Sequence, residues 1–125
     1  MPESDDLTKA ATESLEAARL LASRGFHPDA VSRAYYAIPY AARAALASRG
    51  IAVKTHGGIL QRFGELFVTP GLLPSELTTA FGKAMAIRNR ADYSTAVRPG
   101  KEDSEAVLKD AERFVEAVRG LLSEK

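Results

Sequence analysis

Residues 28–49 read PDAVSRAYYAIPYAARAALASR, and this stretch decides the fold. Its apolar residues recur at spacings of three and four, which places them on one face of an α-helix. Because most of that face is alanine, neighbouring helices can approach it closely. We therefore predict that this segment is the central helix of an all-α bundle, with a core face formed by Val31, Ala34, Tyr35, Ile38, Ala41, Ala42, Ala45 and Leu46.

A second stripe on the same segment is polar and aromatic, where a solvent-facing side would ordinarily carry Glu and Lys. This pattern indicates a contact surface, and its members are Asp29, Arg33, Tyr36, Tyr40 and Arg43. Pro39 removes one backbone hydrogen bond in mid-helix, so we expect a kink there without a break. The alternative is that Pro39 merely replaces a large apolar residue.

Similar helical patterns and stop signals divide the rest of the chain. Gly25 and Gly50 are expected to end the first two helices. The short turn at residues 24–27 favours an antiparallel hairpin. We predict one domain over residues 1–125, an up-and-down antiparallel bundle of four to five helices, with the further helices at 4–23, 56–68 (N-capped by Thr55), 74–93 and 102–122.

Composition limits the classes of function. The chain has 125 residues and a formal net charge of +1, so it has no overall electrostatic attraction to nucleic acid or acidic membranes. It lacks cysteine, which excludes disulfides and thiolate metal sites. No apolar run approaches the ~20 residues of a membrane span, and the acidic start is unlike a signal segment. We expect a cytoplasmic protein with no membrane association, metal site or cofactor.

The predicted helix over residues 74–93 carries charged residues on its core side. Leu77, Phe81, Arg88 and Asp92 share one stripe, so a cation and an anion continue an apolar line. Arg88 can hold a phosphate or a carboxylate with its fork of N–H donors, and Asp92 can orient it. The structural alternative is a bridge from Asp92 to Arg33 or Arg88 that ties this helix to the central one.

Several blocks of the sequence together resemble the HEPN domain family (higher eukaryotes and prokaryotes nucleotide-binding). They cover nearly the whole chain in a specific order: SRAYYAIPYAARAAL, KTHGG, FGELFV, GLLP and RNRADY. The resemblance implies a helical bundle like the C-terminal domain of kanamycin nucleotidyltransferase, often dimeric and often paired with a minimal nucleotidyltransferase. Many family members are metal-independent ribonuclease toxins, and others only bind a nucleotide or a partner.

The ribonuclease branch of the family carries an Arg followed after four to six residues by a His, usually with a polar residue directly after the Arg. Arg88 and Asn89 match the first two positions. The histidine is absent, because its three allowed positions are occupied by Tyr93, Ser94 and Thr95.

Two other residues are candidates for the missing acid–base role. A tyrosine such as Tyr93, with an ordinary pKa near 10, is a poor general base at neutral pH. His56 could enter the cleft from the third helix, although a local role as a cap or hydrogen-bond partner beside Gly57 and Gly58 is favoured. His27 is expected to serve a similar purpose at a helix start.

Three functions fit these observations. The favoured one is a non-enzymatic HEPN module of a two-component, toxin–antitoxin-like system, which binds a nucleotide or a nucleotidyltransferase partner through Arg33, Tyr36, Tyr40, Arg88, Asp92 and Tyr93. The second is a ribonuclease toxin that uses Arg88, Asn89 and a displaced acid or base, Tyr93 or His56. The third is a structural, dimerising bundle whose arginine–tyrosine stripe is an interface. We expect a homodimer, and RNA is a less favoured ligand than a nucleotide.

Overall fold

The computed structural model of the chain describes residues 2–93 and 98–123. Every regular element in these residues is helical, which confirms the predicted all-α bundle. The elements, in chain order, are α1 (Pro2–Ser23), α2 (His27–Ala47), α3 (His56–Phe63), the π-helical turn η1 (Gly64–Val68), α4 (Glu76–Tyr93) and α5 (Lys101–Ser123).

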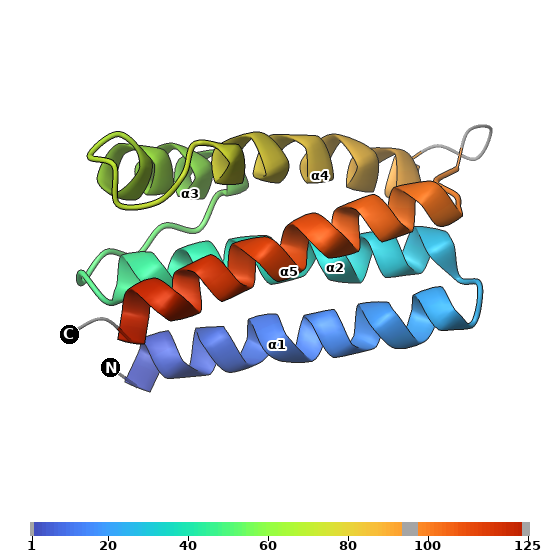
Figure 1. Cartoon of the computed structure of the whole chain (residues 1–125), viewed down its shortest axis with the longest axis horizontal. Coiled ribbons are helices and arrows are strands. Elements are labelled where there is room, and N and C mark those ends of the chain that lie inside the picture. Colours follow the sequence, from blue (N-terminus) through green and yellow to red (C-terminus); the bar gives the residue numbers. More distant parts are fainter. Residues whose placement is uncertain (1, 94–97, 124–125) are drawn as a thin grey trace.

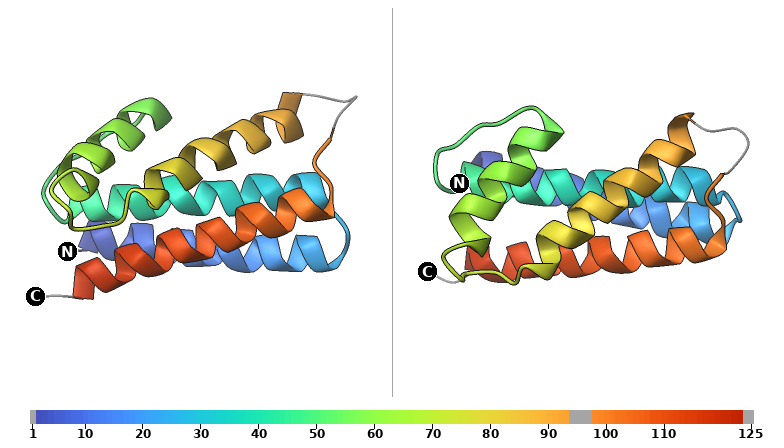
Figure 2. Two further views of the ribbon diagram at one scale, coloured as in Figure 1. Left: turned by 45° about the horizontal axis from the view of Figure 1, so that its top comes forward. Right: turned by 90° about the horizontal axis from the view of Figure 1, so that it is seen from above.

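The long helices α1, α2 and α5 lie side by side, and α3 and α4 each pack against α2 (Figure 1). In two further views, α3 and η1 form one helical segment and α4 forms another. Both segments lie over the layer of long helices (Figure 2). Helix α2 contacts α1, α3, α4 and α5, so it has the central place that its sequence predicts.

The alanine face of α2 determines how closely the other helices pack. Its alanines are buried, and Ala34, Ala42 and Ala45 are 0% exposed. Aromatic rings from the other elements fill the space that these small side chains leave: the Phe63 and Phe114 ring centroids are 4.9 Å apart, and those of Phe81 and Phe114 are 6.0 Å apart. The core therefore combines a small-residue helix with large partners.

The ends of α1 and α2 follow the glycine signals. Gly25 and Gly50 have φ values of 83° and 74°, a left-handed conformation that glycine adopts without steric cost. The next amide after each glycine bonds back into the helix, from Phe26 to the Leu21 carbonyl at 2.9 Å and from Ile51 to the Leu46 carbonyl at 3.0 Å. Helix α2 is continuous across Pro39, so the predicted absence of a break is confirmed, and the kink stays a prediction.

The predicted third helix differs from the expectation in its second half. Its start is confirmed, because Thr55 is the N-cap and its hydroxyl accepts a hydrogen bond from the Gly58 amide at 3.1 Å. The α-helix ends at Phe63, however, and the wider turn of η1 follows. This turn leaves both Phe63 and Phe67 buried, with ring centroids 5.4 Å apart. Core packing of these two rings therefore accompanies the departure from α-helical geometry.

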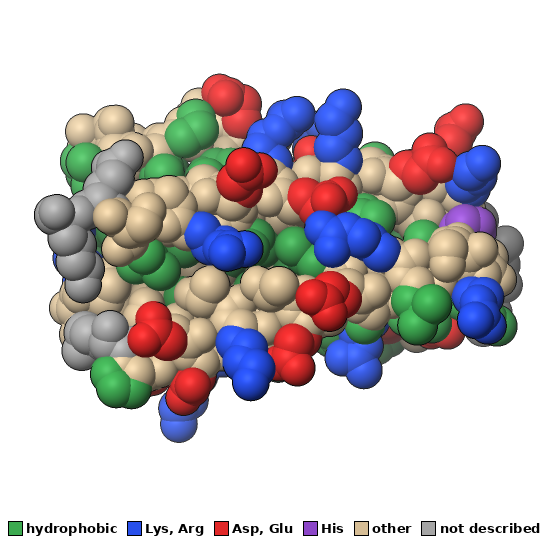
Figure 3. Space-filling model, turned by 60° about the horizontal axis from the view of Figure 1, so that its bottom comes forward, with side chains coloured by type: hydrophobic (Ala, Val, Ile, Leu, Met, Phe, Trp, Pro, Cys, Tyr) green, Lys and Arg blue, Asp and Glu red, His purple; other side chains and the backbone are tan. Residues whose placement is uncertain are grey.

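The face formed by α1 and α5 carries acidic and basic side chains interspersed (Figure 3). One pair joins the two helices, because Arg19 Nη2 lies 2.8 Å from Glu112 Oε2. In residues 2–93 and 98–123, no helix combines the length and the apolar character needed to cross a bilayer.

Replacing Ala45 with Leu should lower the free energy of unfolding by about 1–3 kcal/mol, because a well-packed core accepts extra methylene groups only with strain. Urea unfolding measures this change. Ala106→Leu is the matched control: Ala106 is exposed on α5, so its replacement should change stability by no more than about 0.5 kcal/mol. An equal midpoint for Ala45→Leu and the wild type would contradict the close packing of α2.

Candidate functional site

Arg88 of α4 lies over the aromatic rings of α2. Its guanidinium carbon is 5.0 Å from the ring centroid of Tyr35 and 5.8 Å from that of Tyr36. Arg88 Nη1 donates to Asp92 Oδ2 at 3.0 Å, and Ser32 donates to the other carboxylate oxygen, Oδ1, at 3.0 Å. The side chain of Arg88 is only 13% exposed. The guanidinium of Arg88 thus packs against two rings and pairs at one edge with the Asp92 carboxylate. That carboxylate is in turn hydrogen-bonded to Ser32 of α2.

Tyr35 links this arginine to a histidine. Its ring is fully buried, and its hydroxyl lies 2.8 Å from Nδ1 of His56. The same ring packs edge-on against Phe81 of α4, with centroids 6.1 Å apart. One buried side chain therefore fixes the relative positions of α2, α3 and α4 at the point where Arg88 and His56 approach each other.

The environment shifts the proton equilibria of all three groups. Burial lowers the pKa of His56, and the positive charge of Arg88 lowers it further, so the imidazole is neutral at pH 7. Burial raises the pKa of Tyr35 against the opposing effect of Arg88, so its phenol keeps its proton. Burial alone would lower the pKa of Arg88, but Asp92 and the two tyrosines outweigh it and the pKa is raised. The cluster is a cation beside a neutral phenol and a neutral imidazole.

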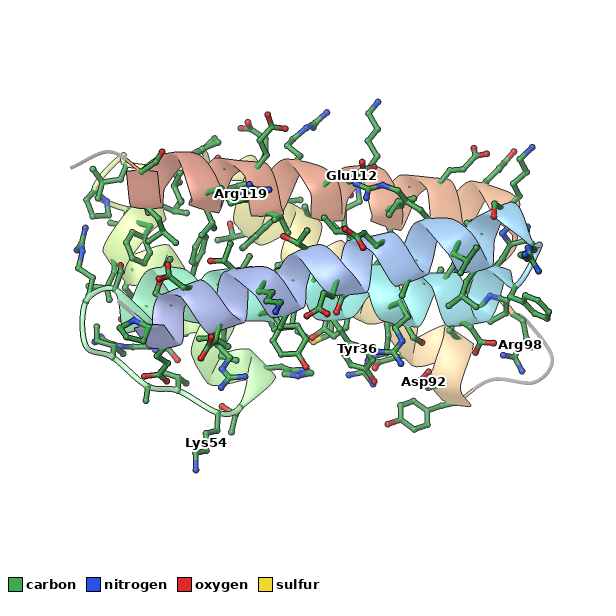
Figure 4. All side chains as sticks on the ribbon, turned by 90° about the horizontal axis from the view of Figure 1, so that it is seen from below. Tyr36, Lys54, Asp92, Arg98, Glu112 and Arg119 are labelled. Atoms are coloured by element: carbon green, nitrogen blue, oxygen red, sulfur yellow. The ribbon has the colours of Figure 1, made fainter. Side chains whose placement is uncertain are left out.

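A pocket of ≈ 220 Å³ adjoins this cluster between α2 and α3. Tyr36 and His56 belong to both the cluster and the pocket. The remaining lining residues are Pro39, Tyr40, Arg43, Lys54 and Ile59. Figure 4 shows Tyr36, Asp92 and Lys54 on the side of the molecule away from α5. Aromatic and cationic side chains thus form a groove from Arg88 along α2, which we call the α2–α3 groove.

Larger hollows elsewhere have a different charge character. A hollow of ≈ 440 Å³ between α4 and α5 contains Glu76 and Asp110 beside Lys83 and Arg113. Another of ≈ 390 Å³ between α1 and α5 contains Glu112 and Glu116 beside Arg19 and Arg119. The pocket of the α2–α3 groove has no carboxylate in its described lining, so it is the better match for an anion despite its smaller volume.

The structure brings together some of the predicted site residues and separates others. Tyr36, Tyr40, Arg88 and Asp92 all line or adjoin the groove. Of the two bridges considered as the structural alternative, Asp92 forms the one to Arg88 and not the one to Arg33, and its link to the central helix is the hydrogen bond from Ser32. Five further residues considered from the sequence are peripheral or lie outside the described residues. Arg33 and Asn89 are exposed, Tyr93 is 79% exposed at the end of α4, and Ser94 and Thr95 lie outside the described residues.

The two histidines make long-range contacts. The local capping role expected of His56 belongs to Thr55, and His56 reaches across to α2. His27, which begins α2, bonds through Nδ1 to the Ser104 hydroxyl of α5 at 2.9 Å. Within the described residues, no group of three or more His, Cys, Asp and Glu side chains is placed to hold a metal ion.

Three polar residues of the cluster and groove, Ser32, Tyr35 and Lys54, were not assigned to the site from the sequence, whereas Arg43 was predicted on the contact stripe of the central helix. Ser32 could have been found, because it continues the three-and-four spacing of Tyr36 and Tyr40 on α2. Tyr35 was assigned to the core, which is correct, but its hydroxyl and ring face also serve the site. Lys54 lies in a segment without regular structure, so no periodicity could have placed it.

The fold and the groove define a class of small, all-α helical bundles with a buried arginine on one face. Comparison with solved structures shows the same fold. TT1696 from Thermus thermophilus matches with a TM-score of 0.80 at 20% identity over 96% of this chain and 98% of that one. ST0689, described as an archaeal HEPN homologue, matches with a TM-score of 0.70 at 20% identity over 98% and 100% of the two chains.

Sequence comparison identifies the family. The model of the HEPN domain matches residues 4–121, and this chain belongs to the HEPN domain family. A "Putative toxin" of Methanocaldococcus jannaschii is 36% identical over 94% of this chain and 87% of its own length. A UPF0332 protein of Gloeobacter violaceus is 33% identical over 98% of both chains.

The free energy of unfolding should fall as the pH is lowered through the titration of His56. Its folded-state pKa lies below the ordinary value of 6.5, so in this range the unfolded chain binds more protons than the folded one. The stabilisation is therefore complete above pH 6.5 and is lost as the pH falls through the folded-state pKa.

His56→Asn is the variant that isolates this effect, because its amide can still bond to the Tyr35 hydroxyl but does not titrate. Urea unfolding between about pH 7.5 and pH 5 should show a shallower loss of stability in the variant than in the wild type. Identical pH slopes would contradict a lowered pKa for His56.

Proposed function

We propose that this HEPN protein binds a nucleotide in the α2–α3 groove, with Arg88 as the phosphate contact. The observation that carries the proposal is the arrangement of Arg88 itself: a mostly buried guanidinium over two tyrosine rings, oriented by Asp92 and next to Tyr36, which lines a cationic, aromatic pocket. Charge-assisted hydrogen bonds from a pre-oriented arginine are the strong ones in phosphate recognition.

The neighbouring side chains suit the rest of a nucleotide. Tyr36 and Tyr40 offer ring faces on which a base can stack. His56, held at Nδ1 by Tyr35, has its second ring nitrogen left for a ligand. Because the protein's net charge is only +1, the attraction for an anion is local to this groove.

We further propose that the protein acts in a two-component, toxin-like system together with a minimal nucleotidyltransferase. Two relatives described as putative toxins, both from Methanocaldococcus jannaschii and 36% and 32% identical to this chain, support this role. The exposed Arg33 and Tyr93 belong to residue types enriched where proteins meet, which fits a partner or a homodimer contact.

The test is a thermal-shift titration of the purified protein with AMP, ATP, GTP and a short single-stranded RNA. A nucleotide at about a hundred times its dissociation constant should stabilise the folded state by ~2.7 kcal/mol. Arg88→Ala should abolish the shift relative to its own ligand-free melting temperature, and Arg88→Lys should weaken it because lysine lacks the forked geometry.

Arg90→Ala is the matched control, since Arg90 lies on the same helix but pairs with Asp103 of α5, at 3.2 Å, away from the groove. It should keep the full ligand shift. If no nucleotide stabilises the wild type, or if Arg90→Ala loses the shift as completely as Arg88→Ala, nucleotide binding at Arg88 is wrong.

A second candidate function is metal-independent cleavage of RNA, and the position of His56 favours it. The imidazole is neutral at pH 7 and lies beside Arg88, although it comes from α3 and not from the positions after Arg88. In that role His56 would take the proton of an RNA 2′-hydroxyl as its oxygen forms a bond to the adjacent phosphorus. The bond from phosphorus to the 5′-oxygen of the next nucleotide breaks, which leaves a 2′,3′-cyclic phosphate, and the departing 5′-oxygen takes a proton from water. Arg88 would stabilise the charge on the phosphate.

Incubation of single-stranded RNA with the purified protein in the presence of EDTA tests this candidate. Cleavage should occur in the wild type and fall about 10²–10⁴-fold in His56→Asn, because general base catalysis is worth that much. Tyr93→Phe is the control and should cleave normally. Absence of cleavage in the wild type, or full activity in His56→Asn, would exclude His56 as the base.

A further inference from the structure

We propose that the α2–α3 groove contains a second anion-binding subsite, formed by Arg43 and Lys54, and that its ligand carries two phosphate groups separated by a nucleoside. This inference rests on the proposed binding of a nucleotide phosphate at Arg88 and extends it to the class of ligand.

Arg43 and Lys54 converge on the pocket from different elements. Arg43 is half-buried near the C-terminal end of α2, and Lys54 is exposed in the connection between α2 and α3. Neither side chain belongs to any of the ion pairs found within residues 2–93 and 98–123. Glu3 shares a neighbouring hollow of ≈ 90 Å³ with both cations, but it is exposed and solvated, so it competes weakly with a bound anion.

The spacing along α2 separates this pair from Arg88. The Arg88 guanidinium lies over Tyr36, and Arg43 follows Tyr36 by seven residues, or about 10 Å along the helix axis. A hydrogen bond requires donor and acceptor within about 3.2 Å, so a contact at Arg43, in the pocket lining, and a contact at Arg88, beside Tyr36 and outside that lining, suit two phosphates better than one.

The space between the two cationic ends suits a nucleoside. Tyr36 and Tyr40 occupy successive turns of α2, and Pro39 lies beside them. The pocket volume of ≈ 220 Å³ is below the roughly 300–1,000 Å³ of sites that enclose a whole small ligand. One base and its sugar therefore fill the pocket, and the phosphates on either side of the sugar lie at Arg88 and at the Arg43–Lys54 pair.

Two kinds of ligand carry two phosphate groups separated by a nucleoside: a nucleoside bisphosphate and a single-stranded oligonucleotide. Calorimetric titration with AMP, adenosine 3′,5′-bisphosphate and a 5′-phosphorylated dinucleotide distinguishes them. We expect the ligands with two phosphates to bind about tenfold more tightly than AMP, which is the effect of one added charged hydrogen bond. Tighter binding of the dinucleotide than of the bisphosphate assigns the groove to a nucleic acid strand, and the reverse order assigns it to a small molecule.

Arg43→Gln and Lys54→Gln test the subsite itself. Each should reduce the affinity for two-phosphate ligands towards that for AMP, leave AMP binding unchanged, and lower the slope of log K against log salt for the dinucleotide by about 0.7. Lys83→Gln is the control, because Lys83 lies in the hollow between α4 and α5. It should bind every ligand as the wild type does. Lys54 is exposed, so its variant keeps the test valid even if Arg43→Gln is unstable.

The outcomes separate this inference from the proposed function. If AMP binds and requires Arg88, but the second phosphate adds no affinity, the second subsite is wrong and nucleotide binding stands. Suppose instead that Arg43→Gln and Lys54→Gln weaken the binding of AMP as much as the binding of the larger ligands. Arg43, Lys54 and Arg88 then all contact the same phosphate, and the inference of a ligand with two phosphates is wrong. If neither AMP nor the larger ligands bind, both proposals are overturned.

Discussion

The buried ring of Tyr35 connects the core of this HEPN protein to its candidate site. It is fully buried, packs edge-on against Phe81, and carries the Arg88 guanidinium 5.0 Å from its centroid. Its hydroxyl holds His56 at 2.8 Å. Because a close-packed interior is hardly compressible and transmits strain, a change in the contacts of Tyr35 would displace Arg88 and His56 together. The positions of Arg88 and His56 in the candidate site therefore depend on how Tyr35 packs in the core.

Close approach to α2 is what allows Tyr35 to take this position. The alanines of α2 let the other helices come near, and the phenylalanines of α3, η1, α4 and α5 then fill the remaining space. Tyr35 and Tyr36 are the large residues on the part of α2 that faces α4, so a long side chain from α4 meets their rings. Arginine suits this place, because its planar guanidinium stacks on aromatic faces and still presents donors at its edge.

The α2–α3 groove has a local excess of positive charge, which the small net charge of the whole chain does not reveal. Acidic and basic side chains are mixed over the α1–α5 face (Figure 3) and in the two larger hollows, where their effects largely cancel. In the α2–α3 groove the described charged side chains are Arg43 and Lys54, with Arg88 at one end. Such a groove attracts an anion only at short range, since charges further apart than about 10 Å are screened in physiological salt.

The amino-acid sequence by itself determined the helices, their order and the central place of α2, because these depend on local periodicity and on glycine at helix ends. It also placed Arg88, Asp92, Tyr36 and Tyr40 at the site, since their spacing along two helices departs from an ordinary solvent face. Only the tertiary structure decided that Asp92 accepts a hydrogen bond from Ser32 of α2, that His56 reaches Tyr35, and that Lys54 lines the pocket of the groove. Those contacts join residues far apart in the chain or lie in a segment without periodicity. Their geometry follows from helix packing, which no local pattern encodes.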